Sequence, residues 1–111
     1  MYHSSIDTTD YVPFVEDGVT VGSVHWLSDG SQEPLVSGIW RAEPGEIPEA
    51  FPYDYPLNET IQVLEGSVTI DFADGKQLVL KTGDVVAVAQ GTKSTWSIDP
   101  SSTFRKFFVC H

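Results

Sequence analysis

The sequence predicts an all-β domain that folds as a sandwich or a closed barrel. Nearly every patterned segment alternates apolar and polar residues with a period of two, which is typical of a strand with one buried face. Short clusters of glycine, proline, aspartate and serine separate these segments and mark turns. No stretch shows the apolar period of an amphipathic helix.

The C-terminal half contains the clearest strands. Ser67–Ala73 places three apolar residues on one face, and Asp74-Gly75 then gives the strongest short signal for a hairpin. Glu59, Ile61 and Val63 alternate in the same way and share one face. Further strands are expected at Lys76–Lys81, Val85–Ala89, Ser94–Ile98 and Phe104–Cys110.

The N-terminal half follows the same pattern with longer loops. We expect strands at Val19–Leu27 and Ser37–Glu43, joined by the polar loop Ser28–Pro34. Pro44–Pro56 contains four prolines and therefore cannot form a central strand or a helix interior. Pro13 restricts the segment Tyr11–Glu16 to the edge of a sheet.

Chain length, net charge and cysteine content indicate the class of protein. A chain of 111 residues is one domain, with a core barrel over about 36–110 and edge strands over about 10–27. The net charge of −10 argues against nucleic-acid and anionic-membrane partners. With one cysteine, no signal-peptide pattern and no apolar run near 20 residues, we expect a soluble, cytoplasmic protein.

Two motifs resemble those of the cupins. They are Glu59-x6-Gly66 followed by Asp74-Gly75, and Gly83-Asp84-x6-Gly91. More narrowly, the stretches SGIWRAEPG, ETIQVLEGSVTIDFADG, KTGDVVAVAQGTKSTW and FRKFF resemble small single-domain cupins related to the (S)-ureidoglycine aminohydrolase cupin domain. The resemblance covers roughly residues 38–108 and implies a double-stranded β-helix, or jelly-roll barrel, that pairs as a homodimer.

The resemblance also places four positions where cupins hold a divalent metal such as manganese, zinc, nickel or iron. In this sequence they carry Tyr53, Tyr55, Glu59 and Ser94, so the usual histidines are missing and only the glutamate is retained. Carboxylate and imidazole are strong ligands, whereas a neutral phenol and a hydroxyl are weak ones. If the face of Val19–Leu27 that carries His25 turns inward, His25 could complete a metal site with Glu59.

A second hypothesis needs no metal. Glu59 in an apolar barrel would act as a general acid or base on a small polar metabolite bound inside. The expected binding residues around it are Tyr53, Tyr55, Trp40, Trp96, Ser94 and Ile61. The alternatives are a metal-dependent aminohydrolase- or isomerase-like enzyme and a non-catalytic sensor or partner protein. Arg105 and Lys106 are expected to balance the acidic excess, or else to meet an anionic substrate at the rim.

Overall fold

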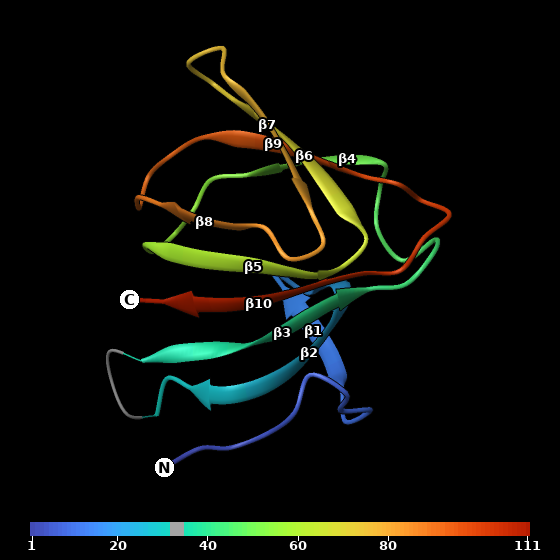
Figure 1. Cartoon of the computed structure of the whole chain (residues 1–111), viewed down its shortest axis with the longest axis vertical. Helices are drawn as coiled ribbons and strands as arrows, with labels where there is room; N and C mark the ends of the chain where they lie inside the picture. The colour runs from blue at the N-terminus through green and yellow to red at the C-terminus, as the bar shows by residue number, and fades with distance from the viewer. Residues whose placement is uncertain (32–34) are drawn as a thin grey trace.

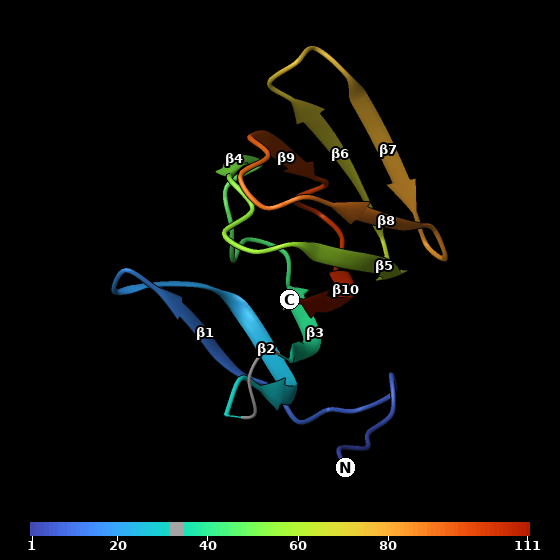
Figure 2. The same cartoon turned by 90° about the vertical axis from the view of Figure 1, so that its left-hand side faces the viewer.

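Two antiparallel sheets face each other and form the jelly-roll barrel of the cupin fold (Figures 1 and 2). The computed structural model describes residues 1–31 and 35–111, and no helix occurs in this part. The larger sheet has the order β1 (Val12–Glu16), β2 (Val19–Asp29), β3 (Val36–Ala42), β10 (Phe104–Cys110), β5 (Glu59–Glu65) and β8 (Val85–Val88). The smaller sheet has the order β4 (Ala50–Tyr53), β9 (Ser94–Ile98), β6 (Ser67–Phe72) and β7 (Gln77–Lys81).

The predicted strands are present, with ends that differ by one or two residues. β2 continues to Asp29, so it takes up the first part of the predicted loop Ser28–Pro34, and residues 32–34 of that loop lie outside the described residues. The proline-rich segment contributes only the short edge strand β4, which pairs with β9 alone. β1 is also an edge strand, as Pro13 predicts.

Tight turns connect the strands where the sequence places glycine. Gly66, between β5 and β6, has φ +77°, and a Cβ there would lie 2.8 Å from the carbonyl oxygen of Thr103. Only glycine allows this close approach of the two backbones. In the turn between β7 and β8, the Asp84 carboxylate accepts a hydrogen bond of 2.9 Å from the backbone N–H of Lys81, as expected for an aspartate that follows a turn glycine.

The inward faces of the two sheets form one core. On β5, the side chains of Glu59, Ile61 and Val63 are buried, as their alternation predicts. Val68 and Ile70 on β6 face them from the smaller sheet and are exposed by 1% or less. The aromatic part of the core comes from Trp40, Tyr55, Trp96, Phe104 and Phe108.

The strict alternation that would place His25 on the same face as Val19 and Val21 breaks in β2 after Val21. Gly22 has φ +72°, and a Cβ at this residue would lie 2.4 Å from the carbonyl oxygen of Arg41. The alternation shifts by one residue here, so Val24 is buried and His25 points away from the interior. A strand pattern read with a strict period of two misses such an irregularity. Within the described residues, no helix is long and apolar enough to span a membrane.

Candidate functional site

A cavity of about 480 Å³ lies at one end of the barrel and is lined by residues of both sheets. Its exposed lining residues come from the β1–β2 hairpin, such as Val19 and Thr20, and from the proline-rich segment around β4, such as Glu46, Pro48, Pro52 and Pro56. The cavity therefore opens beside the hairpin and β4, which Figure 2 shows on the same side of the barrel.

The wall of the cavity is mainly apolar, and three of its aromatic residues come from three different strands. Trp40 comes from β3, Tyr53 from β4 and Trp96 from β9, and all three line the cavity. Trp40 is held in place because its indole N–H donates a 2.8 Å hydrogen bond to the carbonyl oxygen of Val21. Three of the predicted binding residues, Trp40, Tyr53 and Trp96, are thus on the cavity wall.

An ion pair lies on the inner surface of this cavity. The ammonium nitrogen of Lys106 is 2.7 Å from a carboxylate oxygen of Glu59, and the two residues are only 7% and 2% exposed. Strand register explains the contact. Lys106 pairs with Val63 on β5, two inward-facing positions from Glu59, and the long side chains of Lys106 and Glu59 reach toward each other along the inner face. A buried charge pair is stabilised only when its remaining polar groups are also satisfied.

Tyr53 satisfies the second oxygen of this carboxylate. Its phenol donates a short hydrogen bond to Oε1 of Glu59, while Lys106 binds Oε2. Burial raises the pKa of the Tyr53 phenol well above its ordinary value, and the negative charge of Glu59 raises it further. The phenol is therefore a permanent hydrogen-bond donor near neutral pH.

Four aromatic rings surround the ammonium of Lys106. The nitrogen is 4.7 Å from the ring centroid of Trp96 and 5.1 Å from that of Tyr53. Phe108 and Trp40 follow at 5.6 and 5.7 Å. Ring faces attract a cation but accept no conventional hydrogen bond, so Glu59 is the hydrogen-bonding partner of this ammonium within the described part of the chain.

Three predicted binding residues lie behind the cavity wall and do not line it. Tyr55 is fully buried, and its phenol accepts a 3.2 Å hydrogen bond from the indole of Trp96. Burial raises the pKa of Tyr55 to about 12. Ser94 donates a 2.7 Å hydrogen bond to the backbone carbonyl of Tyr53, and Ile61 is fully buried in the core. These residues position the wall and do not offer polar groups to a ligand.

His25 is not brought to Glu59. One ring nitrogen lies 2.7 Å from the backbone oxygen of Asp10, and the other lies 2.8 Å from the hydroxyl of Ser4. Among residues 1–31 and 35–111, no three His, Cys, Asp or Glu side chains are close enough to hold a metal ion. Since Lys106 and Tyr53 already take both oxygens of Glu59, the residues at the four expected positions do not fit a divalent metal.

Lys106 is the central residue that sequence analysis did not place in the site. The predicted charge balance is confirmed, since Arg105 pairs with Glu65 and Lys106 with Glu59. The alternation of β10 contains the missed signal, because Lys106 shares the buried face of Phe104 and Phe108. Cys110 also lines the cavity.

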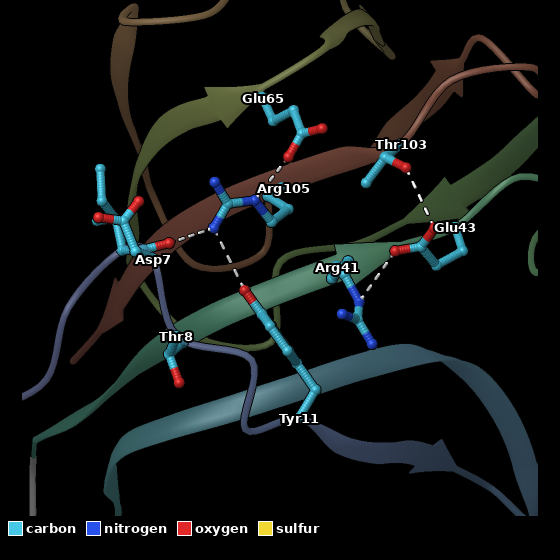
Figure 3. A pocket seen from close by; sticks show the side chains of 9 residues that line it. Asp7, Thr8, Tyr11, Arg41, Glu43, Glu65, Thr103 and Arg105 are labelled. Carbon is cyan, nitrogen blue, oxygen red and sulfur yellow. Dashed lines mark hydrogen bonds and ion pairs between the residues drawn. The ribbon is translucent and has the colours of Figure 1, made fainter.

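A second, polar pocket of about 340 Å³ lies on the outside of the larger sheet (Figure 3). Arg105 donates to the carbonyl oxygen of Ile6 at 2.6 Å and to the phenol of Tyr11 at 3.3 Å. The guanidinium of Arg41 lies 4.0 Å from the ring centroid of Tyr11. Both arginines therefore attach the N-terminal segment to the barrel.

Sequence comparison agrees with this fold. The family model of the EutQ-like cupin domain matches residues 30–108. The chain belongs to the EutQ-like cupin domain family. No curated protein matches the chain.

Solved structures of other proteins are similar to this chain. A DUF861 family protein from Thermotoga maritima is 32% identical, with 66% of this chain and 76% of that chain covered and a TM-score of 0.56. The EutQ protein of Clostridium difficile is 19% identical, with 80% and 66% covered and a TM-score of 0.63. Iron(II) HppE in complex with substrate is 19% identical, with 97% and 59% covered and a TM-score of 0.69. The last two show similarity of fold alone.

Proposed function

We propose that this cupin binds a small polar metabolite in the barrel cavity and acts on it with Glu59 as the acid–base group. One observation carries the proposal. The Glu59–Lys106 ion pair, buried to 2% and 7% exposure, lies on the wall of a cavity of about 480 Å³ that is otherwise mainly apolar. A carboxylate and an ammonium at the inside of an open apolar pocket are a common feature of binding and catalytic sites.

The residues that line the cavity indicate the chemical character of the ligand. Trp40, Phe51 and Trp96 offer ring faces to an apolar or planar part of the molecule. The ammonium of Lys106 offers N–H donors to an oxygen of the same molecule. Glu16 and Glu46 lie at the exposed rim and repel anions, so a ligand without net negative charge is favoured.

The same residues supply acid–base chemistry. Glu59 can accept a proton from a bound molecule while Lys106 polarises the ligand oxygen. Tyr53 fixes the orientation of the carboxylate through its hydrogen bond to Oε1, so Oε2 is the oxygen on the side of Lys106. A metal-dependent reaction, such as the likeness to aminohydrolases implies, has no suitable donor set at these positions.

Thermal-shift screening tests the proposal. Small neutral, cationic and anionic metabolites are added to the wild-type protein, and the compounds that raise Tm are retested by calorimetry. We expect stabilisation by neutral or cationic compounds that is lost in Glu59→Gln. In Val79→Ala, a matched control on the outer face of β7 where Val79 is 49% exposed, the stabilisation should remain.

A hit that binds Glu59→Gln as tightly as the wild type would contradict the site. A hit that binds in the cavity and is recovered unchanged after prolonged incubation would support the sensor alternative over an enzyme. Turnover that disappears in Glu59→Gln would support the acid–base role.

A further inference from the structure

We propose that Lys106 forms a reversible Schiff base with a small aldehyde or ketone, so that the ligand class of the cavity is an uncharged carbonyl compound. This inference rests on the proposed function, since it assigns the ligand of the same cavity. The inference is based on the position of the Lys106 amine, which lies on the cavity wall among aromatic rings and beside the Glu59 carboxylate.

Lys106 differs from the other lysines of the chain. Lys76, Lys81 and Lys93 are exposed, whereas Lys106 is 7% exposed and still lines the cavity. A lysine that condenses with a carbonyl compound must reach that compound and needs a proton acceptor beside it, and Lys106 lines the cavity with the Glu59 carboxylate 2.7 Å away. The three exposed lysines provide an internal comparison within the same protein.

Within residues 1–31 and 35–111, the ammonium has one hydrogen-bonding partner and otherwise faces rings. Glu59 binds it at 2.7 Å, and the centroid of Trp96 lies at 4.7 Å on the cavity wall. Once the amine has lost a proton, its lone pair can attack a carbonyl carbon that enters from the cavity. The rings of Trp40 and Phe51 are available to the substituent of the carbonyl compound.

Glu59 can move the protons that the reaction needs. The Lys106 ammonium gives one proton to Glu59, which leaves a neutral amine beside a neutral acid. The nitrogen forms a bond to the carbonyl carbon, and the former carbonyl oxygen becomes a hydroxyl by taking the proton released from nitrogen. That hydroxyl takes the proton from Glu59 and leaves as water, while the C=N bond forms as a protonated imine. The sum is amine plus carbonyl giving imine plus water, with no oxidant or reductant consumed.

The other groups of the site support this sequence of steps. The hydrogen bond from Tyr53 to Oε1 leaves Oε2 as the oxygen that exchanges protons with Lys106. The acidic rim residues Glu16 and Glu46 discriminate against carbonyl compounds that carry a carboxylate or phosphate. The cavity opening gives the released water a way out.

Reductive trapping tests the inference on the intact protein. The wild type is incubated at neutral pH with propanal or benzaldehyde and sodium cyanoborohydride, which reduces the protonated imine to a stable secondary amine. Peptide mass spectrometry then measures the rate of labelling at each lysine. We expect Lys106 to be labelled at least about tenfold faster than Lys76, Lys81 and Lys93, because Glu59 acts on it as a proton acceptor.

Two variants provide controls. Lys106→Arg retains a cation for Glu59 but forms no imine, so labelling at residue 106 should disappear while the exposed lysines react at unchanged rates. Glu59→Gln should slow labelling of Lys106, because the proton acceptor is lost.

Equal rates at Lys106 and the exposed lysines would overturn the inference. If a metabolite from the thermal-shift screen still binds in the cavity in that case, only the Schiff base is wrong and the proposed function remains. If no compound of the screen binds and Lys106 is also unlabelled, both are wrong.

Discussion

The Glu59 carboxylate is hydrogen-bonded to the ammonium of Lys106 and to the phenol of Tyr53, and these two contacts determine the effect of substituting any of the three residues. Lys106 takes one oxygen and Tyr53 the other, so the carboxylate is buried without an unsatisfied atom. A buried charge loses its hydration, and it is tolerated only while its partner is present. Substitution of either charged residue thus affects stability as well as function.

A double-mutant cycle on Glu59 and Lys106 measures this dependence. Each single variant, Glu59→Gln or Lys106→Met, should lose about 3–5 kcal/mol of unfolding free energy, because it leaves one buried charge unpaired. The double variant should lose clearly less than the sum, since no buried charge remains. Urea unfolding provides the values, and additive losses would mean that the two charges do not interact.

The reactivity of the Cys110 thiol provides a second test of a single residue. Burial raises the pKa of its thiol to about 11, above the ordinary value of 9.0, and the charge of Glu59 adds to the effect. The thiolate fraction at pH 8 should therefore be about a hundredfold smaller than that of a free thiol. N-ethylmaleimide should label native protein slowly and urea-unfolded protein at the ordinary rate. Equal rates in both states would show that Cys110 is not in the cavity wall.

At the level of the strands, the sequence pattern predicts the buried face of some elements and fails for others. The alternation of β5 and β6 predicts their inward faces, since both strands run through the core with a period of two. β2 does not follow this rule, because Gly22 shifts its faces by one residue and turns His25 outward.

Lys106, the partner of Glu59, was missed for a different reason. A lysine on an apolar face is ordinarily a surface residue, and only the register between β5 and β10 shows that Lys106 reaches Glu59.

The glycine at the irregular point of β2 can be tested with a matched control. Gly22 and Gly18 both have positive φ, +72° and +78°, so alanine strains the backbone at either residue. A Cβ at Gly22 would also meet the backbone oxygen of Arg41 at 2.4 Å, whereas a Cβ at Gly18 meets nothing within 4 Å.

We therefore expect Gly18→Ala to cost about 1 kcal/mol of unfolding free energy and Gly22→Ala at least about 3 kcal/mol. Denaturant unfolding of the two variants measures the difference. Similar costs for the two substitutions would mean that β2 and β3 are not so closely apposed at Gly22.

For the whole molecule, the cavity depends on both sheets and on the β1–β2 hairpin. Trp96 comes from the smaller sheet, Glu59 and Lys106 from the larger one, and Val19 from the hairpin at the mouth. The edge strand β1 also presents Val12 and Val15, which are 48% and 56% exposed. The homodimer implied by the cupin resemblance stays a prediction, and sedimentation equilibrium would test it.

Alkaline pH should weaken the entire fold. The pKa of Tyr55 is raised to about 12 from the ordinary value of 10.0, so above pH 10 the unfolded chain has released a proton that the folded chain retains. Stability is then fully present below about pH 10 and falls by about 1.4 kcal/mol per pH unit as the pH rises through 12. The pKa values of Tyr53 and Cys110 are also raised, so these two groups also lower the unfolding free energy as the pH rises. Urea unfolding at pH 9, 10 and 11 measures the slope, and constant stability over this range would contradict the burial of these groups.

The central claim is that the ammonium of Lys106, and not a metal ion, is the cation bound to Glu59 in this cupin. Elemental analysis of tag-free protein, dialysed against manganese, zinc, nickel and ferrous iron and then freed of excess metal, tests it most directly. We predict far less than one metal ion per chain, with no difference between the wild type and Glu59→Gln. One metal ion per chain that is lost in Glu59→Gln would contradict the claim.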